Sequence, residues 1–386
     1  MSVDFMRIAV VAETFNPFNG GSAKRYYEVL KRLVGDGYEI DLFTVRLSKH
    51  WAINENIDGI NIHRTERPFE DFITEDGFRS ITKVLLYSSW ASKKVSENNY
   101  HIIESNHCPI FPVIGTWLAS KLSKTPLSVT FHEAWHSQWY WHVPNKLYAP
   151  FGITLEKLYV KMPDIGIAVS KTTATRLISL LNMNKEKVVT IPNGVDLNLF
   201  NSVKSKKEDY KIIYVGRLNP HKRVDWLIDA LNYVRRMYEV HLEVVGDGPM
   251  RCEYEAYVKK KNLEKHVTFL GPLDNKSLVE RLKQAYIYVL PSIREGQSIT
   301  TLEAMAAGTP QIVVNVDGNG AAELLKESRS GLIAKPNPFN IANQMMGMLN
   351  DRSLWLELQR NGYNFVQDYD WSKIAEMYSK VYDSLA

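Results

Sequence analysis

The sequence is poor in cysteine. Cys108 and Cys252 are its only two cysteines, and neither belongs to a CxxC pair or stands at a zinc-ligand spacing from histidine. The sequence therefore indicates neither a disulfide framework nor a structural zinc site. Two unpaired thiols fit a reducing compartment, so we expect a cytoplasmic protein without a bound metal.

A long apolar run is also missing. The N-terminus has no basic stretch followed by an apolar segment, and the most apolar later run, residues 108–119, is short and interrupted by Pro109 and Pro112. The sequence predicts a soluble protein and leaves open whether it touches the cytoplasmic face of a membrane.

The chain has little excess of one charge. It has 47 Lys and Arg and 43 Asp and Glu, which gives a formal net charge of +4. The positive and negative residues are interleaved along the sequence except near residues 204–207. This balance weakly favours anionic ligands and is poor evidence for nucleic acid. Glycines at the spacing of a GxGxxG motif or a P-loop are absent too, which lowers the support for an NAD enzyme or a simple ATPase.

What the chain does have is length. Its 386 residues exceed the size at which one hydrophobic core usually stops growing, so we expect two domains. The composition, 45% hydrophobic and 23% charged, is typical of a globular protein. A cleft between two domains would be the natural place for a site.

Apolar, β-branched runs alternate with helical segments along the whole chain. Near-continuous apolar strands of this kind indicate a parallel sheet covered by helices on both faces. The first set of runs comprises residues 7–12, 39–44, 101–104, 127–131 and 165–170. The second set comprises residues 211–216, 241–246, 267–271, 286–291 and 311–314. The sequence thus predicts an α/β protein with two parallel-sheet domains.

A polar segment separates the two sets of strands. IPNGVDLNLF is followed by the charged stretch NSVKSKKEDY, which has the turn residues and polarity of a linker, so we place the boundary near residue 196. A last amphipathic helix follows the second sheet and still has an apolar face to bury. That face consists of Trp371, Ile374, Ala375, Tyr378, Val381, Tyr382 and Leu385.

Two cations follow the first strand of the second set. In YVGRLNPHKRVDWLIDAL the strand ends at Gly216, and Arg217 and Lys222 flank a turn before the next helix. At the carboxyl end of a parallel strand, such a pair is well placed to hold a phosphate or diphosphate. A solvated basic loop is an equally good interpretation of this stretch alone.

Glycines mark two further strand-to-helix turns. Gly20 and Gly21 lie between the first strand and the first helix, where backbone amides can approach an anion. A plain turn is the more common explanation of a single glycine pair. In EVVGDGP, we interpret Asp247 between two glycines as a turn residue and not as a metal ligand.

The segment REGQSITTLEAMAAGTP carries two glutamates eight positions apart, Glu295 and Glu303. Eight helical residues advance about 12 Å and turn about 800°, which would place the two carboxylates on different faces, unlike a glycosidase pair. We therefore expect Glu295 in a strand-to-helix loop and Glu303 about one turn into the helix. Each could bind a different part of one elongated ligand, with the amides near Ser298, Ile299 and Thr300 between them. Two structural acids are the alternative.

A histidine and a cluster of aromatic residues follow one strand of the first set. His132 comes directly after that strand, at the edge where sites of α/β proteins gather, although a structural histidine is more common there. The aromatic side chains suit stacking on sugar rings or on an apolar acceptor, and packing within their own domain explains them equally well. They are Trp135, Trp139, Tyr140 and Trp141.

Five segments, in this order and at this spacing, resemble the large family-four retaining glycosyltransferases of the GT-B fold. They are IPNGVDLNLF, VGRLNPHKRVDWLIDAL, VVGDGP, VTFLGPL and PSIREGQSITTLEAMAAGTP. The resemblance implies two Rossmann-like domains facing across a cleft, with the C-terminal helix crossing back to the N-terminal domain. Residues 1–195 with 371–386 would form the acceptor-side domain, and residues 196–370 the domain that binds the nucleotide sugar.

The same resemblance implies an activity. The enzyme would move a hexose-type sugar from a UDP- or GDP-linked donor to a glycan, a lipid-linked glycan or a small hydroxyl acceptor. The anomeric configuration would be retained, without metal or cofactor. A sugar-nucleotide epimerase and a non-catalytic binding protein of similar fold stay open as alternatives, and the sequence makes no prediction of the oligomeric state.

Matched positions suggest the residues involved. Arg217 and Lys222 would hold the diphosphate and neutralise the charge of the leaving group. Glu303 would bind the ribose hydroxyls, Glu295 the donor sugar, and His132 would lie beside that sugar. The further donor-binding positions are Gly20, Gly21, Leu273, Gln297, Ser298, Ile299 and Thr300.

The chain also departs from the family pattern at three positions. Gln297 and Ser298 stand where an aromatic residue and a glycine are common. Glu104 stands where a histidine is frequent, although His107 follows shortly after it. The loop of Gln297 and Ser298 is therefore where we expect the donor preference to be set.

Overall fold

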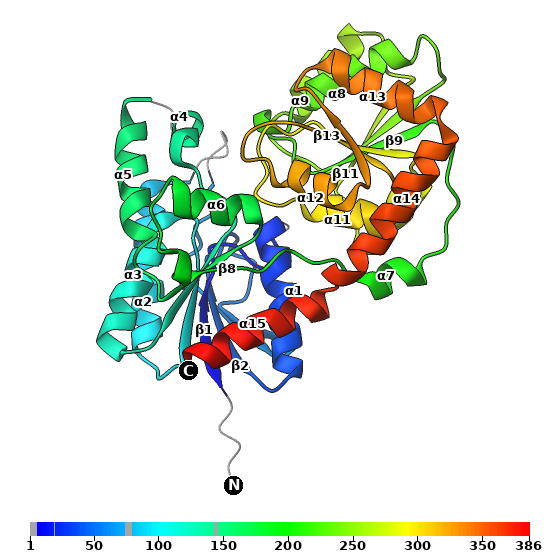
Figure 1. Cartoon of the computed structure of the whole chain (residues 1–386). Coiled ribbons are helices and arrows are strands. Elements are labelled where there is room, and N and C mark those ends of the chain that lie inside the picture. Colours follow the sequence, from blue (N-terminus) through cyan, green and yellow to red (C-terminus); the bar gives the residue numbers. More distant parts are fainter. Residues whose placement is uncertain (1–5, 19, 74–78, 143–145) are drawn as a thin grey trace. The chain divides into compact units, whose positions relative to one another are not determined.

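The computed structural model describes residues 6–18, 20–73, 79–142 and 146–386, without the side chains of residues 141 and 142. The chain divides into two compact units. We call them the N-terminal unit, Met1–Asn193 with Trp371–Ala386, and the C-terminal unit, Gly194–Asp370. Each contains a mainly parallel sheet between layers of helices, which confirms the predicted α/β class (Figure 1).

The N-terminal unit is built on an eight-stranded sheet with the order β3-β4-β2-β1-β5-β6-β7-β8. Only β3 and β4 pair in the antiparallel sense. The strands are β1 Arg7–Val11, β2 Glu39–Thr44, β3 Asn54–Ile57, β4 Ile60–Arg64, β5 Ile102–Asn106, β6 Leu127–Phe131, β7 Ile165–Ala168 and β8 Val188–Thr190. Every residue of β5 and β6 is buried because helices cover both faces of the sheet.

Helices α2, α3 and α5 lie on one side of this sheet, and α1 and α15 lie on the other (Figure 1). The helices are α1 Gly21–Gly35, α2 Ile81–Ser96, α3 Ile110–Ser123, α4 Trp139–His142, α5 Ala149–Tyr159, α6 Lys171–Ser179 and α15 Trp371–Leu385. Short 3-10 turns are η1 His136–Gln138, η2 Lys146–Tyr148 and η3 Lys185–Lys187.

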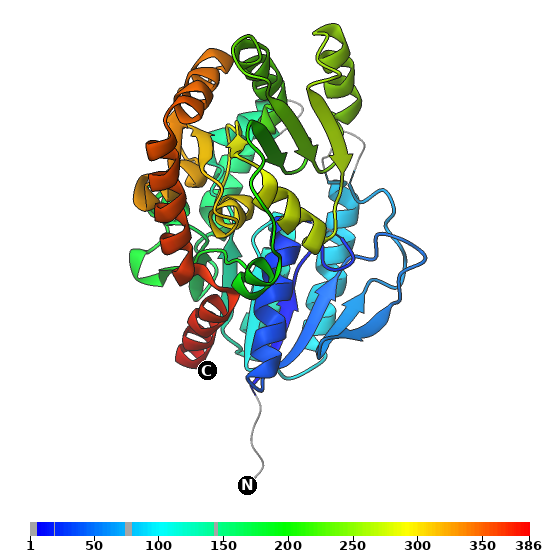
Figure 2. The same cartoon turned by 90° about the vertical axis from the view of Figure 1, so that its right-hand side faces the viewer.

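The C-terminal helix α15 packs against α1, and Figure 2 shows the two helices from their solvent side in red and blue. The apolar face predicted for this helix is buried, apart from the half-buried Leu385. The helix therefore completes the hydrophobic core of a unit whose other elements end near residue 193.

A buried polar network joins α15 to the centre of the same sheet. Tyr378 Oη accepts a hydrogen bond from Arg25 Nε at 3.0 Å and lies 2.9 Å from Thr130 Oγ1. Thr130 Oγ1 donates in turn to Glu104 Oε1 at 2.6 Å, and Tyr26 Oη donates to the same oxygen at 3.2 Å. Burial raises the pKa of Glu104, while these hydrogen bonds lower it. The network fixes the position of α15 on the sheet because each of its bonds is buried.

The C-terminal unit has a six-stranded parallel sheet with the order β11-β10-β9-β12-β13-β14. Numbered within the unit, this is the strand order 3-2-1-4-5-6 of doubly wound dinucleotide-binding folds. The strands are β9 Lys211–Val215, β10 His241–Val245, β11 Val267–Gly271, β12 Ile287–Leu290, β13 Gln311–Val314 and β14 Gly331–Ala334.

The helices of this unit follow the strands in alternation. They are α7 Leu197–Ser202, α8 Val224–Val234, α9 Arg251–Lys260, α10 Asn275–Gln284, α11 Ile299–Ala306, α12 Gly320–Ser328, α13 Pro338–Asn350 and α14 Arg352–Val366. Two 3-10 turns, η4 Pro220–Lys222 and η5 Gln367–Tyr369, complete the unit. Helix α8 has an apolar face that repeats at helical spacing and is buried; it consists of Val224, Leu227, Ile228, Leu231 and Val234.

Four strands lie outside the apolar runs of the sequence: β3, β4, β8 and β14. All four are at or next to a sheet edge, where part of each strand is less deeply buried. β3 reads NENI, β4 alternates between buried and half-buried residues, and β8 has three residues. Runs of this kind are hard to distinguish from loops.

We predict that Tyr378→Phe weakens the attachment of α15. The change leaves Arg25 Nε without its acceptor inside the core, at an expected cost of about 1–3 kcal/mol. Hydrogen exchange of the amides in residues 371–385 should become faster. Tyr363→Phe, at a residue that is 44% exposed in the C-terminal unit, is the matched control and should leave this exchange unchanged. Equal exchange in wild type and Tyr378→Phe would show that the network does not hold the helix.

Candidate active site

The C-terminal unit has a topological switch between β9 and β12. These two strands are neighbours, and the sheet continues from β9 to β10 on one side and from β12 to β13 on the other. The loops that follow them therefore diverge at the carboxyl edge of the sheet, where ligands of open α/β sheets bind. The predicted cations follow β9, and the predicted glutamate Glu295 follows β12.

An ion pair links these two loops. Lys222 ends the 3-10 turn after β9, and its Nζ lies 2.5 Å from Glu295 Oε1. Only 17% of the lysine side chain and 11% of the glutamate side chain are exposed, so water screens this pair much less than it would screen a surface pair. The structure thus brings together two of the predicted site residues from positions 73 apart in the sequence.

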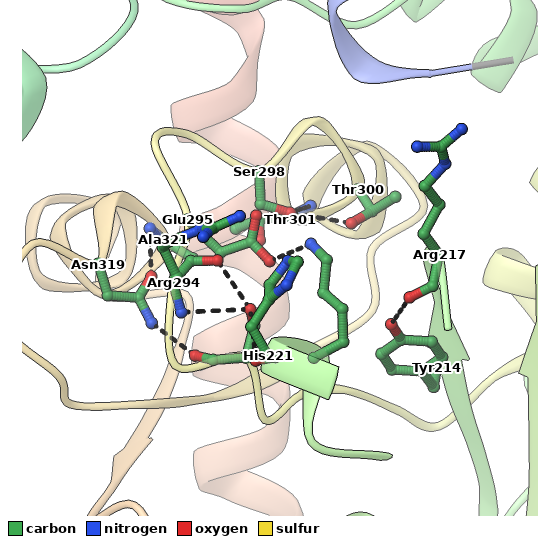
Figure 3. Close-up of polar contacts among 12 residues, drawn as sticks. Tyr214, Arg217, His221, Arg294, Glu295, Ser298, Thr300, Thr301, Asn319 and Ala321 are labelled. Carbon is green, nitrogen blue, oxygen red and sulfur yellow. Dashed lines mark hydrogen bonds and ion pairs between the residues drawn. The ribbon is translucent and has the colours of Figure 1, made fainter. Parts of the chain in front are cut away.

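Arg217 lies at the start of the same loop. Its backbone carbonyl accepts a hydrogen bond from Tyr214 Oη at 2.9 Å, which fixes the main chain directly after β9. Its side chain is exposed and extends away from Glu295 (Figure 3). The two predicted cations therefore differ in exposure: Lys222 is largely buried beside a carboxylate, whereas Arg217 is exposed.

Backbone hydrogen bonds hold the loop between β12 and α11 against its neighbours. The amide of Ile293 donates to the carbonyl of His221 at 3.0 Å, which ties this loop to the turn of Lys222. The amide of Gly320, at the start of α12, donates to the carbonyl of Glu295 at 2.8 Å. A Cβ on Gly320 would lie 1.9 Å from the carbonyl oxygen of Gly296, so only glycine permits this contact.

Asn319 connects three parts of this arrangement and was not among the predicted site residues. Its Nδ2 donates to the carbonyls of Ser292 at 3.0 Å and Val314 at 3.1 Å, and its Oδ1 accepts from the amide of Ala321 at 3.0 Å (Figure 3). It is 4% exposed. The dipeptide NG before a run of alanines and leucines was the available sign of this helix cap.

Helix α11 begins at the loop of Glu295. Ser298 is its N-cap, and Ser298 Oγ accepts from the amide of Thr301 at 3.2 Å. Tyr288 Oη lies 2.7 Å from Thr300 Oγ1, which fastens the first turn to β12. Glu303 lies about one turn into the helix and is 2% exposed, whereas Glu295 lies in the loop, so the two acids have the separate placements that the spacing argument requires.

The other end of α11 is held by Lys207. Its Nζ donates to the carbonyls of Ala307 at 3.3 Å and Leu282 at 3.4 Å, and to Thr309 Oγ1. A cation is favourable at the carboxyl end of a helix because it complements the helix dipole. Burial and the nearby charge of Lys283 lower the pKa of Lys207 to about 7. The stretch interpreted as an exposed linker thus contains a partly buried anchor.

The glycine-rich turn after β10 supports the loop of Arg217. A Cβ on Gly248 would lie 2.7 Å from the backbone of Leu218, and the amide of Leu218 donates to the carbonyl of Asp247 at 2.9 Å. The Asp247 carboxylate accepts from the amide of Gly248 at 2.8 Å, as expected of a turn residue. Leu273, in the loop after β11, packs half-buried against the core of the unit.

The N-terminal unit has its own switch, between β1 and β5. Gly20 is the N-cap of α1, which starts at Gly21 after the loop from β1. Glu13, at the start of this loop, is 4% exposed and accepts a hydrogen bond from Arg79 Nε at 3.0 Å. This buried ion pair was missed because the sequence separation of 66 residues gives no sign of it.

His132 follows β6 at the same edge of the sheet, beside His107, which follows β5. The amide of His132 donates to His107 Nδ1 at 3.1 Å, and the ring centroids are 5.8 Å apart. Burial lowers the pKa of His107 to about 4, and burial, with the nearby His107 and Arg25, holds the pKa of His132 well below its usual value. Both rings are therefore neutral at pH 7. Within the described residues, neither Nε2 has a hydrogen-bond partner.

The aromatic loop after His132 is organised by a buried carboxylate on α5. Glu156 accepts from the amides of Trp135 and His136 and from Trp139 Nε1, at 2.8, 2.8 and 2.9 Å. Trp139 also packs on α5, because a Cβ on Gly152 would lie 2.5 Å from its ring. Packing within the domain thus accounts for Trp135 and Trp139.

The remaining two aromatic residues of this loop behave differently. Tyr140 is 44% exposed. The side chain of Trp141 lies outside those that the structure describes.

Over the described chain, no group of three or more His, Cys, Asp or Glu side chains is arranged to hold a metal ion.

Comparisons with known proteins match both units. The sequence profile of the family described as Glycosyl transferases group 1 matches residues 196–365, and that of Glycosyltransferase Family 4 matches residues 19–199. An uncharacterised glycosyltransferase of Methanocaldococcus jannaschii is 27% identical, over 98% of this chain and 98% of that protein.

Solved structures of similar fold cover the whole chain as well. The sucrose-phosphate synthase from Thermosynechococcus elongatus has a TM-score of 0.82 at 22% identity, over 98% of this chain and 99% of that one. HepE of Anabaena, in complex with UDP, has a TM-score of 0.76 at 18% identity, over 98% of this chain and 100% of that one. These likenesses establish the GT-B fold.

The neutral His107 should make the protein sensitive to acid. Its pKa is about 4 in the folded chain and near 6.5 in the unfolded one, so between these values only the unfolded chain binds the proton. The free energy of unfolding should therefore fall by on the order of 3 kcal/mol between pH 7 and pH 4 through this residue. Urea denaturation of wild type and His107→Asn at several pH values measures this contribution.

Asparagine keeps an acceptor for the His132 amide but has no proton to gain. Acidification should therefore lower the free energy of unfolding less in His107→Asn than in wild type, and the difference should equal the contribution of His107 given above. In His50→Asn, at an exposed position, acidification should lower it as much as in wild type. A variant that loses as much stability as wild type on acidification would show that His107 is not buried in its neutral form.

Proposed function

Because the chain belongs to the group 1 glycosyl transferases, and is therefore a glycosyltransferase, we propose that it moves a hexose-type sugar from a nucleotide diphosphate sugar to a hydroxyl acceptor. We further propose that the anomeric configuration is retained. The observation that carries this proposal is the Lys222–Glu295 ion pair at the switch between β9 and β12. It places a cation for a diphosphate beside a carboxylate for sugar hydroxyls.

The donor is proposed to be UDP- or GDP-linked. HepE, which shares the fold, was solved with UDP. In this chain the diphosphate would lie between the exposed Arg217 and Lys222. The first amides of α11 would add hydrogen bonds and the positive end of the helix dipole.

Two acids would hold the ends of the donor. Glu295, in the loop, would accept hydrogen bonds from hydroxyls of the sugar, and Glu303, one turn into α11, from those of the ribose. The orientation of α11 supports this assignment because its N-terminal end lies at the loop of Glu295. Gln297 and Ser298 lie between the two acids, so the proposal makes their loop the determinant of the sugar.

In the proposed transfer, the bond between the anomeric carbon and the diphosphate oxygen breaks while the acceptor oxygen forms its bond on the same face. Negative charge then develops on the diphosphate. Arg217 and Lys222 would stabilise this charge in place of a metal ion. The acceptor hydroxyl gives its proton to an oxygen of the departing diphosphate.

The proposal also gives roles to His132 and to the glycines of the N-terminal unit. Among the described residues the buried Nε2 of His132 has no hydrogen-bond partner, which supports a hydrogen bond between this neutral ring and the donor sugar. Gly20 and Gly21 would approach the diphosphate through their backbone.

The exposed aromatic ring of Tyr140 would stack on the acceptor, which we propose to be a glycan, a lipid-linked glycan or a small molecule. We place the enzyme in the cytoplasm, in keeping with its two cysteines, neither of which forms a disulfide.

A panel of UDP- and GDP-sugars, with EDTA present and acceptor extracts added, tests the donor, the acceptor class and independence of metal together. Release of the nucleotide diphosphate with a new glycoside is the expected result. Interconversion of the donor without an acceptor would identify a sugar-nucleotide epimerase instead, and binding without turnover a non-catalytic protein. If no sugar nucleotide binds, the donor assignment is wrong.

Glu295→Ala should abolish transfer while the fold stays intact. The change removes the proposed ligand of the donor sugar and the partner of Lys222, so we expect turnover to fall by about 100-fold or more. Release of the nucleotide diphosphate measures turnover, and circular dichroism checks the fold. Glu280→Ala, at an exposed position on α10, is the control with normal turnover expected. Turnover near that of wild type in Glu295→Ala would refute its role.

Arg217→Ala should weaken binding of the nucleotide diphosphate by about 10-fold or more, since charge-assisted bonds to phosphate are strong. Titration calorimetry with UDP and GDP measures this loss. Arg223→Asn is the matched control in the same loop. It removes a cation that pairs with Asp225, and asparagine tolerates the left-handed backbone that residue 223 adopts at φ 50°. Equal weakening in both variants would mean that general loop charge, and not Arg217, holds the diphosphate.

A further inference from the structure

The sheet side opposite α1 and α15 carries three helices that pack together, α2 with α3 and α3 with α5 (Figure 1). We call the exposed side chains of these helices and of the adjoining turn η2 the outer helical face. No helix among the described residues is long and apolar enough to cross a membrane. The proposed transfer reaction uses no residue of this face.

Large apolar side chains are exposed on the outer helical face. Of the seventeen large hydrophobic residues found exposed in the described chain, nine lie on these elements. They are Ile81, Leu85 and Leu86 on α2, Leu118 and Leu122 on α3, and Leu147, Tyr148, Phe151 and Leu158 on η2 and α5. The exposed fractions are 83% for Leu147, 81% for Leu122 and 68% for Phe151. Such a concentration on one side of a domain marks an interaction surface.

The charge of the outer helical face has one sign. Residues 81–96, 110–123 and 146–161 contain seven lysines and a single acid, Glu156, which is 2% exposed because it binds the aromatic loop. The lysines are Lys83, Lys93, Lys94, Lys121, Lys146, Lys157 and Lys161. Lys93 and Lys121 have 77% and 55% of their side chains exposed.

The acids close to these lysines lie at the margins of the face. Glu97 follows α2 and lies 3.1 Å from Lys94 and 3.9 Å from Lys93, Asp164 lies 3.9 Å from Lys121, and Asp71 pairs with Lys83. A helix of the C-terminal unit shows the contrast: α9 carries three cations together with Glu253 and Glu255. Along α2 and α3, lysine and apolar side chains occur without any acid.

We propose that the outer helical face docks the protein on an anionic lipid membrane. Exposed Leu, Ile, Phe and Tyr side chains would enter the interfacial layer, and the lysines would extend to the lipid phosphates around them. Helices that lie in a membrane interface combine these two kinds of side chain, and each lysine near an anionic surface adds to the attraction. The face supplies both from one rigid layer of the unit.

A second copy of the chain fits this face poorly. A twofold dimer would place the same patch against itself, so lysines of one copy would meet lysines of the other. The charge of the patch instead favours a partner with spread negative charge. A lipid surface has this property and adapts to apolar side chains distributed over three helices.

Co-sedimentation of the full chain with vesicles tests the proposal and involves no turnover, so its outcome is independent of the proposed transfer. Vesicles of phosphatidylcholine with phosphatidylglycerol should pellet the protein, and pure phosphatidylcholine vesicles should pellet much less. Added salt should weaken the binding because it screens the lysines. Lys93→Glu with Lys94→Glu should lower the partition coefficient at least 25-fold, since each lysine contributes about fivefold.

Apolar docking is tested by Leu122→Glu with Phe151→Glu, which should reduce binding to the level seen with pure phosphatidylcholine. The controls make the same changes on the C-terminal unit: Lys259→Glu with Lys260→Glu on α9, and Phe339→Glu with Leu356→Glu at residues 59% and 48% exposed. Both controls should bind like wild type. Circular dichroism establishes that each variant is folded.

Three results would overturn the proposal. Wild type that stays in the supernatant with anionic vesicles shows that no such docking occurs. Equal losses in the face variants and their controls show that general charge and apolarity, and not this face, govern binding. The third result is a protein that binds no vesicles but forms a dimer. If Leu122→Glu with Phe151→Glu dissociates this dimer, the face is a contact between copies of the chain.

Discussion

The proposed donor site of this enzyme depends on the ion pair of Lys222 and Glu295. A doubly wound sheet sends the loops after β9 and β12 in opposite directions, so their side chains would diverge unless something joined them. The ion pair makes that connection between side chains, and the hydrogen bond from Ile293 to His221 makes it through the backbone. Both charges are largely shielded from water, so the separation of cation and carboxylate is fixed at the place where the proposed diphosphate and sugar meet.

Helix α11 extends from this connection and is held at both ends. Ser298 caps its first turn, Tyr288 fastens that turn to β12, and Lys207 binds the carbonyls at its last turn. The helix is only eight residues long, and a short helix has little stability of its own. Fixed ends therefore matter more here than in a longer helix, because they set the distance between Glu295 in the loop and Glu303 on the helix.

The sequence was sufficient for the parts of this arrangement that are local. The alternation of apolar runs predicted both sheets, and the spacing argument separated Glu295 from Glu303 correctly. Contacts between distant segments were missed: Glu156 reaches an aromatic loop about twenty residues before it, and Asn319 joins two loops through its amide. Lys207 was taken for part of an exposed linker, since composition cannot reveal that one lysine among several turns inward. The physical reason is common to all three, because buried hydrogen bonds follow from packing and leave no periodic pattern.

The N-terminal unit uses buried polar groups in a different way. In the C-terminal unit the ion pair lies at the edge of the sheet, where the donor is proposed to bind. In the N-terminal unit Glu104 lies inside the sheet, and its hydrogen-bonded neighbours lead through Thr130 to Tyr378 on α15. Thr130 lies in β6, two residues before His132, which follows that strand, and the Tyr26 ring packs edge-on to His132. A helix from the end of the chain thus supports the strand that precedes His132, so α15 contributes to the core beside a residue of the proposed site.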